Sequence, residues 1–186
     1  MEAKPAGRRI CLYNAAELSD VLDTMAQQLA GLLVGSKRVM LVGILRRGAP
    51  LAEMLHQRLV SRFKLDAISL MNLQIKRYAD DLTLLHPETQ LTENPAHESL
   101  DLSGVSVVVV DDVMYRGHSM LRAVEYLDRK QAGEIRTVVL VDRGATKLPV
   151  RSDITGVRLD VAPADVIECN IPPYETELKI ELLKSL

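Results

Sequence analysis

The sequence predicts an α/β fold in which a mostly parallel, open sheet is flanked by helices and carries a small hood formed by the terminal segments. Two apolar runs, Val39–Leu45 and Val105–Val110, have the length and composition of strands that are buried on both faces. Helical patterns separate these runs, and strands that alternate with helices pair in parallel through right-handed crossovers. The chain has 186 residues and contains neither a repeat nor a linker, which predicts a single domain spanning residues 1–186.

The first helix is expected to begin at Asn14, whose side chain can cap the first free amides. Glu17, three positions later, can complete a capping box, and Gly35 supplies the expected end. Helical spacing places one set of apolar residues on a single face: Leu18, Val21, Leu22, Met25, Leu29, Leu32 and Leu33.

A polar cluster follows the strand Val39–Leu45 and consists of Arg46, Arg47 and Gly48. A second amphipathic helix is expected from about Pro50, because Pro is tolerated in the first helical turn. Leu65–Ile75 is a further predicted strand.

Between residues 76 and 103 the apolar periodicity disappears, and acidic residues and prolines accumulate. A stretch of this length without a periodic pattern predicts a flexible functional loop. A hairpin whose strands are too short to recognise explains the same composition. On the sequence both interpretations stay open, and they are compatible with each other.

The strongest strand pattern, Val105–Val110, ends in the acid pair Asp111 and Asp112. After a short turn comes a helix whose expected inner face is Met120, Leu121, Val124 and Leu127. The next apolar strand, Thr137–Val141, ends in a third polar cluster of Asp142, Arg143 and Gly144. Val157–Leu186 contains prolines and β-formers, which predicts short strands or a small cap beside the main sheet.

Three predicted strands therefore end in polar clusters, which begin at Arg46, Asp111 and Asp142. In an open α/β sheet, ligands bind outside the carboxyl ends of the strands. Parallel pairing gathers these ends along one edge of the sheet. We therefore expect a single site at that edge.

The middle cluster combines two chemistries. Asp111 and Asp112 are adjacent carboxylates at the end of an apolar strand, a costly position for charge unless a ligand or a metal uses it. The turn after them opens a helix, whose backbone amides and dipole favour a phosphate. That turn consists of Tyr115, Arg116, Gly117, His118 and Ser119. A ribose 5-phosphate offers hydroxyls to the acids and a phosphate to the turn.

The stretch VVVVDDVMYRGHS, residues 107–119, closely resembles the ribose-phosphate signature of type I phosphoribosyltransferases. Three further segments resemble the same family: LVGILRRGAPLAEML (41–55), YADDL (78–82) and VLVDRGATKLPVRSDITG (139–156). Together the matching segments run from roughly residue 14 to 160. The combination of DDVMY, VDRG and LPVRSD is similar to one subgroup, the bifunctional PyrR pyrimidine-operon regulators and uracil phosphoribosyltransferases.

The resemblance implies how the ribose phosphate is held. Asp111 and Asp112 would bind the ribose hydroxyls and would hold Mg²⁺ indirectly, through these hydroxyls or water. The 5-phosphate would lie in the turn made by Tyr115, Arg116, Gly117, His118 and Ser119.

The resemblance also implies where the two reaction partners lie. The pyrophosphate would contact Arg46, Arg47 and Gly48, since a guanidinium suits bidentate phosphate binding. The catalytic part of the flexible loop would contain Arg77 and Tyr78. The base would lie against Val141, Asp142 and Arg143.

The implied reaction displaces pyrophosphate from C1 of phosphoribosyl pyrophosphate by a ring nitrogen of a nucleobase, with Mg²⁺ as cofactor. Uracil is the expected base, because hypoxanthine-guanine enzymes usually carry an Asp where this chain has Tyr115. One alternative is a purine substrate, namely hypoxanthine, guanine or adenine. The other is a non-catalytic regulator that senses nucleotides and binds RNA.

The chain departs from the family pattern at three places near one ligand. The phosphate turn has Arg116 and Ser119 where Thr is usual, and the pyrophosphate loop has Leu45 and Arg46 where polar and small residues are expected. The flexible loop has Ala79 where the subgroup generally carries Arg. These changes leave room for a divergent substrate.

Composition limits the partners. A net charge of −2 and the absence of Trp give no electrostatic or stacking case for nucleic acid, and we interpret Arg58, Arg62 and Lys64 as a solvated surface.

The isolated Cys11 and Cys169 suit a reducing cytoplasm, and no apolar run reaches the ~20 residues of a membrane helix. We expect a cytoplasmic protein, and the family resemblance implies a homodimer or a larger homo-oligomer.

Overall fold

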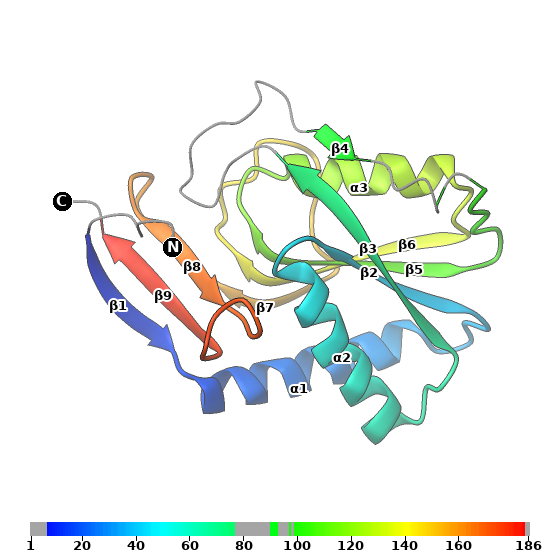
Figure 1. Ribbon diagram of the computed structural model, residues 1–186, viewed down its shortest axis with the longest axis horizontal. Helices are drawn as coiled ribbons and strands as arrows, with labels where there is room; N and C mark the ends of the chain where they lie inside the picture. The colour runs from blue at the N-terminus through cyan, green and yellow to red at the C-terminus, as the bar shows by residue number, and fades with distance from the viewer. Residues whose placement is uncertain (1–6, 77–89, 93–96, 98, 185–186) are drawn as a thin grey trace.

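The computed structural model describes residues 7–76, 90–92, 97 and 99–184. Its main sheet contains, in spatial order, β4 (Gln90–Thr92), β3 (Ile68–Lys76), β2 (Val39–Ile44), β5 (Ser106–Met114), β6 (Glu134–Asp142) and β7 (Ile154–Arg158) (Figure 1). The five strands from β3 to β7 in this order are parallel, and β4 pairs with β3 in the antiparallel direction. The predicted α/β class with a mostly parallel sheet is confirmed.

Helices cover both faces of this sheet (Figure 1). α1 (Ala15–Leu32) and α2 (Gly48–Phe63) lie on one face, and α3 (His118–Arg129) lies on the other. Val108 and Val110 of β5 pack into the core beneath α1 and α2, whereas Val107 and Val109 pack into the core beneath α3. A strand covered on both faces is apolar at successive positions, which explains the run of four valines. Among the described residues, none of the helices has the length and apolar composition needed to cross a bilayer.

A second, smaller sheet forms the hood. It consists of β1 (Arg8–Tyr13), β9 (Lys179–Lys184) and β8 (Val166–Asn170), all antiparallel, so the two ends of the chain meet in it (Figure 1). The predicted hood from the terminal segments is confirmed. The Sγ atom of Cys169 in β8 lies 3.9 Å from the carbonyl oxygen of Asp112 in β5, so the hood stands beside the carboxyl end of β5.

The start of α1 follows the prediction. Asn14 Oδ1 accepts hydrogen bonds from the amides of Ala16 and Glu17, at 2.9 and 3.1 Å. In return, Glu17 Oε2 accepts the amide of Asn14 at 2.8 Å. The capping box is therefore complete. The helix ends at Leu32, and Gly35 follows with a φ of 87°, a conformation that glycine adopts without strain.

α2 begins at Gly48, so Pro50 lies in its first turn as predicted. Two other sequence predictions are wrong. β5 does not end before the acid pair but continues through it, because its pairing with β6 extends to Met114 and Asp142. The inner face of α3 contains Met120, Ala123, Tyr126 and Leu127, whereas Leu121 and Val124 are only half-buried. Ala123 and Tyr126, three positions apart on the helix, are both fully buried.

The predicted loop 76–103 contains a hairpin, as one of the two interpretations required. β3 pairs with β4 through Gln74 and Thr92, Ile75 and Leu91, and Lys76 and Gln90. Residues 77–89, which include the predicted catalytic Arg77 and Tyr78 as well as Ala79, lie outside the described residues. The catalytic role of this loop stays a prediction.

Candidate active site

The loop between β2 and α2 lies directly against the end of β5. A Cβ atom on Gly48 would lie 2.5 Å from the carbonyl oxygen of Val110 and 3.3 Å from Cα of Asp111, so no side chain fits at this position. The peptide bond before Arg46 is cis. The close approach of the two backbones brings Arg47 near enough to Asp112 for the two charges to interact.

The acid pair consists of two half-buried carboxylates on consecutive residues of β5. The amide of Asp112 donates to Asp111 Oδ1 at 2.9 Å. Burial raises the pKa of both side chains, and the charge on Asp112 raises the pKa of Asp111 further. Arg47 offsets part of the rise in the pKa of Asp112. Two like charges held together in a partly buried place favour the binding of a cation or of hydroxyl donors.

α3 begins at this same edge of the sheet. Gly117 forms its N-cap with a φ of 83°, and no side chain makes a capping hydrogen bond there. A Cβ on Gly117 would lie 3.0 Å from Cγ2 of Thr146, so this glycine also allows the segment after β6 to pack against the turn. Because no side chain caps this N-terminus, the positive end of the helix dipole favours an anion here.

Tyr115 links the phosphate turn to the predicted base-binding residues. The guanidinium of Arg143 lies 4.4 Å from the centroid of the Tyr115 ring, and that of Arg116 lies 5.2 Å from it. Arg143 Nη2 donates to the carbonyl oxygen of Asp165 at 2.8 Å, and burial lowers the pKa of Arg143. The unusual Arg116 of the turn is therefore placed against its neighbour's ring.

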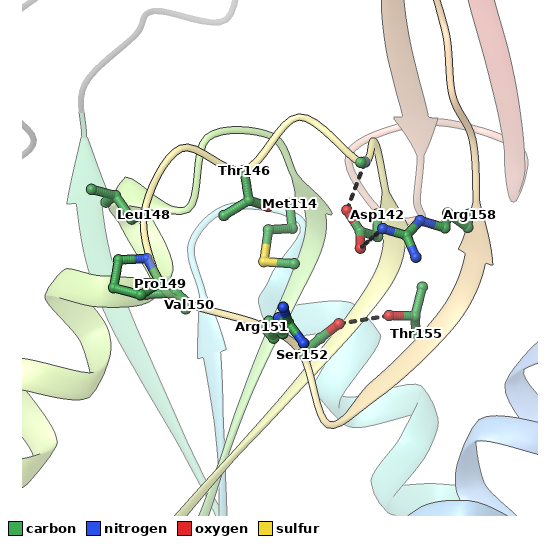
Figure 2. Close-up of a pocket in the computed structure, with 11 residues that line it drawn as sticks. Met114, Asp142, Thr146, Leu148, Pro149, Val150, Arg151, Ser152, Thr155 and Arg158 are labelled. Atoms are coloured by element: carbon green, nitrogen blue, oxygen red, sulfur yellow. Dashed lines mark hydrogen bonds and ion pairs between the residues drawn. The ribbon is translucent and has the colours of Figure 1, made fainter.

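A cavity of about 540 Å³ lies at the carboxyl ends of β5, β6 and β7 (Figure 2). Asp142, a predicted base-binding residue, lines it and accepts hydrogen bonds within the loop, from the Gly144 amide at 2.8 Å. Its other oxygen lies 3.9 Å from Arg158 Nη2. The hydroxyls of Ser152 and Thr155, also in the lining, are 2.6 Å apart. Neither the acid pair nor Arg46 and Arg47 belong to the described residues that line this cavity.

Five further polar residues of this lining were not predicted from the sequence: Thr146, Arg151, Ser152, Thr155 and Arg158. The first four lie in the stretch 139–156 that resembles the family, which was their only signal, and Arg158 ends β7. Val141, in contrast, has a fully buried side chain within the β-ladder, so only its backbone could contact a ligand.

Two residues of the hood were also missed. The guanidinium of Arg46 lies over the ring of Tyr174, 4.9 Å from its centroid. Arg47 forms an ion pair with Glu175, the next residue of the hood. No local sequence pattern predicts contacts between residues 128 positions apart.

The structure thus gathers the three predicted clusters at one edge of the sheet. The loop of Arg46, Arg47 and Gly48 meets the acid pair, and the phosphate turn meets Arg143. The individual ligand-binding roles of these residues stay proposals.

The acid pair fits a Mg²⁺ ion that is shared with a ligand. Among the residues that the structure describes, no group of three or more His, Cys, Asp or Glu side chains could hold a metal ion. Asp111 and Asp112 supply two carboxylates, and Mg²⁺ commonly binds through one or two carboxylates together with substrate oxygens and water.

The basic cluster on α2 is held by internal ion pairs. Asp23 of α1 accepts Arg58 Nε at 2.8 Å through one oxygen and Arg62 Nη2 at 2.8 Å through the other. Lys64 Nζ donates to the carbonyl oxygen of Ser61 at 3.1 Å. These contacts join α1 to α2 and leave less positive charge for an outside partner.

The five parallel strands flanked by helices, with a small hood beside them, have the fold of the type I phosphoribosyltransferases. Residues 12–176 match the phosphoribosyl transferase domain, and the chain belongs to that family. The protein is a phosphoribosyltransferase.

Within the family the chain is similar over most of its length to proteins named Bifunctional protein PyrR. It is 33% identical over 174 residues to the one from Thermus thermophilus, covering 92% of this chain and 93% of the relative. To the one from Actinobacillus pleuropneumoniae it is 30% identical over 175 residues, covering 94% and 96%.

Solved structures of hypoxanthine phosphoribosyltransferases share the fold. The enzyme from Staphylococcus aureus superposes with a TM-score of 0.72 at 17% identity, covering 94% of this chain and 91% of that one. The enzyme from Trypanosoma cruzi, in complex with the product IMP, has a TM-score of 0.72 at 14% identity, covering 98% and 94%.

Proposed function

We propose that the protein transfers the phosphoribosyl group of phosphoribosyl pyrophosphate to uracil, giving UMP and pyrophosphate. We call the loop of Arg46, Arg47 and Gly48 the arginine loop. The observation that carries this proposal is the close approach of the arginine loop to the acid pair, where Gly48 lies against β5. One edge of the sheet thereby offers acceptors for ribose hydroxyls and donors for phosphate.

In this proposal each group stabilises one part of the substrate. The 5-phosphate binds the first amides of α3, and Asp111 and Asp112 accept the two ribose hydroxyls. A ring nitrogen of uracil attacks C1 as the bond from C1 to the pyrophosphate oxygen breaks. Arg46 and Arg47 stabilise the negative charge that develops on the leaving group. Positioning supplies much of the rate, because no side chain needs to act as a nucleophile.

Mg²⁺, bound through the ribose hydroxyls or water near the acid pair, would neutralise part of the charge on the pyrophosphate. Arg77 and Tyr78 would act in the segment that closes over the leaving group and excludes water, within the proposed flexible loop of residues 76–103.

Two observations support uracil over a purine. The curated relatives are named PyrR, and a tyrosine, Tyr115, stands where the hypoxanthine-guanine enzymes usually carry an aspartate. Arg143 lies against this tyrosine with its buried Nε atom lacking a hydrogen-bond partner among the described residues. Such a donor suits a base with an exocyclic carbonyl oxygen, which uracil shares with hypoxanthine and guanine, so this contact supports a carbonyl-bearing base and does not separate uracil from these purines.

The direct test is pyrophosphate release from phosphoribosyl pyrophosphate and Mg²⁺ with one base at a time. We expect release with uracil and none above background with hypoxanthine, guanine or adenine. Release with a purine alone would show that this purine, and not uracil, is the substrate of the same reaction. Release with none of the bases by a protein that binds phosphoribosyl pyrophosphate would contradict the enzymatic proposal.

Regulation of a pyrimidine operon through RNA is the second candidate, and it rests on the PyrR resemblance. The pairing of Arg58 and Arg62 with Asp23 argues against an RNA surface on α2. We therefore expect no salt-dependent RNA affinity in filter binding at low ionic strength, where a phosphate-binding surface is strongest. Affinity that falls steeply with added salt would establish the regulator.

We further propose that the protein works in the cytoplasm as a homodimer or a larger homo-oligomer, in line with its family resemblance. Light scattering coupled to size-exclusion chromatography measures the assembly directly. A monomer at micromolar concentration would contradict this part of the proposal.

A further inference from the structure

The hood reaches the arginine loop through a carboxylate. Glu175 Oε1 lies 2.5 Å from Arg47 Nη2, and Glu175 Oε2 lies 3.4 Å from Arg47 Nε. Both side chains are largely shielded, with exposed fractions of 15% for Glu175 and 31% for Arg47. Pairing of this kind fixes the plane of the guanidinium as well as its position.

Glu175 is itself held in place by its own turn. Its Oε2 atom accepts the amide of Ile171 at 2.9 Å, and the side chain of Ile171 is fully buried in the core. Burial alone would raise the pKa of Glu175, but the hydrogen bonds from Arg47 and Ile171 lower it below its ordinary value. The carboxylate is therefore ionised at neutral pH and is anchored to the backbone of Ile171.

The preceding residue of the hood holds the other arginine. The ring of Tyr174 lies 4.9 Å from the guanidinium carbon of Arg46, within the range of a cation–π contact. Two consecutive residues of the hood thus contact two consecutive residues of the arginine loop. The placement of both arginines depends on the hood.

The contacts of Arg47 leave part of its guanidinium for a ligand. A guanidinium carries five N–H donors, of which Glu175 engages one on Nε and one on Nη2. Nη1 has no hydrogen-bond partner among the described residues, and the charge of Arg47 acts on Asp112. Three donors therefore remain for a ligand, two on Nη1 and the second on Nη2.

We propose that Glu175 is the positioning residue for Arg47 and orients its remaining donors toward the pyrophosphate of the substrate. This inference rests on the proposed function, because it takes Arg47 to bind pyrophosphate. It adds that affinity for the leaving group is set from the hood, by a residue that does not touch the ligand.

The test compares two ligands that occupy different parts of the site. Titration calorimetry with Mg²⁺ and pyrophosphate reports on the arginine loop, whereas titration with ribose 5-phosphate reports on the acid pair and the phosphate turn. We expect Glu175→Gln to raise the Kd for pyrophosphate about tenfold, the effect of one misplaced charge-assisted hydrogen bond. The Kd for ribose 5-phosphate should not change.

A second variant separates geometry from charge. Glu175→Asp keeps the carboxylate but shortens the side chain, so it should also weaken pyrophosphate binding if Glu175 positions Arg47. The matched control is Glu177→Gln, which removes the same charge from a side chain that is 72% exposed and 3.9 Å from Lys179. Its two dissociation constants should equal those of the unmodified protein.

Three outcomes would overturn the inference. In the first, Glu175→Gln binds pyrophosphate as tightly as the unmodified protein, or more tightly, as expected of a carboxylate that competes for Arg47. In the second, both ligands are weakened equally and Tm falls, which indicates a purely structural role. In the third, the unmodified protein binds neither ligand, and then the proposed function fails as well.

Discussion

Replacing Asp111 and Asp112 together by Asn is expected to lower pyrophosphate release roughly 10³-fold or more, because it removes the groups that we propose hold the ribose and its cation. Asn keeps the size of the Asp side chain, but it replaces one acceptor oxygen by an NH₂ donor and carries no negative charge to attract Mg²⁺. The loss should appear in kcat/KM with every base that supports the reaction.

The same substitution is expected to raise Tm. Burial raises the pKa of both carboxyls in the folded protein above the ordinary value of 3.8. The folded state therefore binds these protons more tightly than the unfolded state, so stability is lost as the pH rises from the unfolded value through the folded pKa. At neutral pH an ionised pair destabilises the protein, and the neutral amides remove that cost.

A combined loss of activity and gain in stability distinguishes this result from misfolding. The measurements are pyrophosphate release and thermal unfolding without added ligand, at pH 7. Asp66→Asn with Asp128→Asn is the matched control, since it removes two charges from exposed positions outside the site. Activity within a factor of about ten of the unmodified protein, a barrier change near 1.4 kcal/mol, would contradict the assigned role of the acid pair.

The sequence predicted best what depends on neighbouring residues. The capping box of Asn14 and Glu17 needs only three positions of chain, and the valines of β5 show their double burial directly in composition. The edge where the site lies also follows from local information, because parallel strands place their carboxyl ends together.

The missed features depend on contacts between distant elements. Glu175 meets Arg47 across 128 positions, and Asp23 meets Arg58 across 35, and neither acid belongs to a pattern that indicates its partner. Tyr126 was missed for a different reason. Its position follows the helical spacing of Ala123 and Leu127, but a tyrosine is as often half-exposed as buried, so its residue type alone does not indicate burial.

These distant contacts change how the site is understood. The sequence places the pyrophosphate arginines, the acid pair and the base segment on three separate loops. In the structure the arginines also contact the hood, whose strands come from both ends of the chain. The hood therefore contributes to the site through its contacts with residues that the sequence assigned to the main sheet.

Gly48→Ala is expected to damage both stability and activity, because the added Cβ would lie 2.5 Å from the carbonyl oxygen of Val110. The atom it meets belongs to the backbone of a central strand, so relief requires the arginine loop to move away from β5. We expect the free energy of unfolding to fall by about 1–3 kcal/mol, as for other overpacked sites. A displacement of about 1 Å between Arg47 and Asp111 should lower kcat/KM on the order of 100-fold.

Gly31→Ala provides the matched control for this change. Gly31 lies within α1, and a Cβ there would meet nothing within 4 Å. Replacing a helical glycine by Ala should stabilise the protein by about 0.5–1 kcal/mol and leave activity unchanged. Gly48→Ala could retain full activity and Tm only if the arginine loop moved away from β5 to make room for the Cβ atom and this movement had no effect on catalysis. The close approach of these two backbones could then no longer support the proposed reaction.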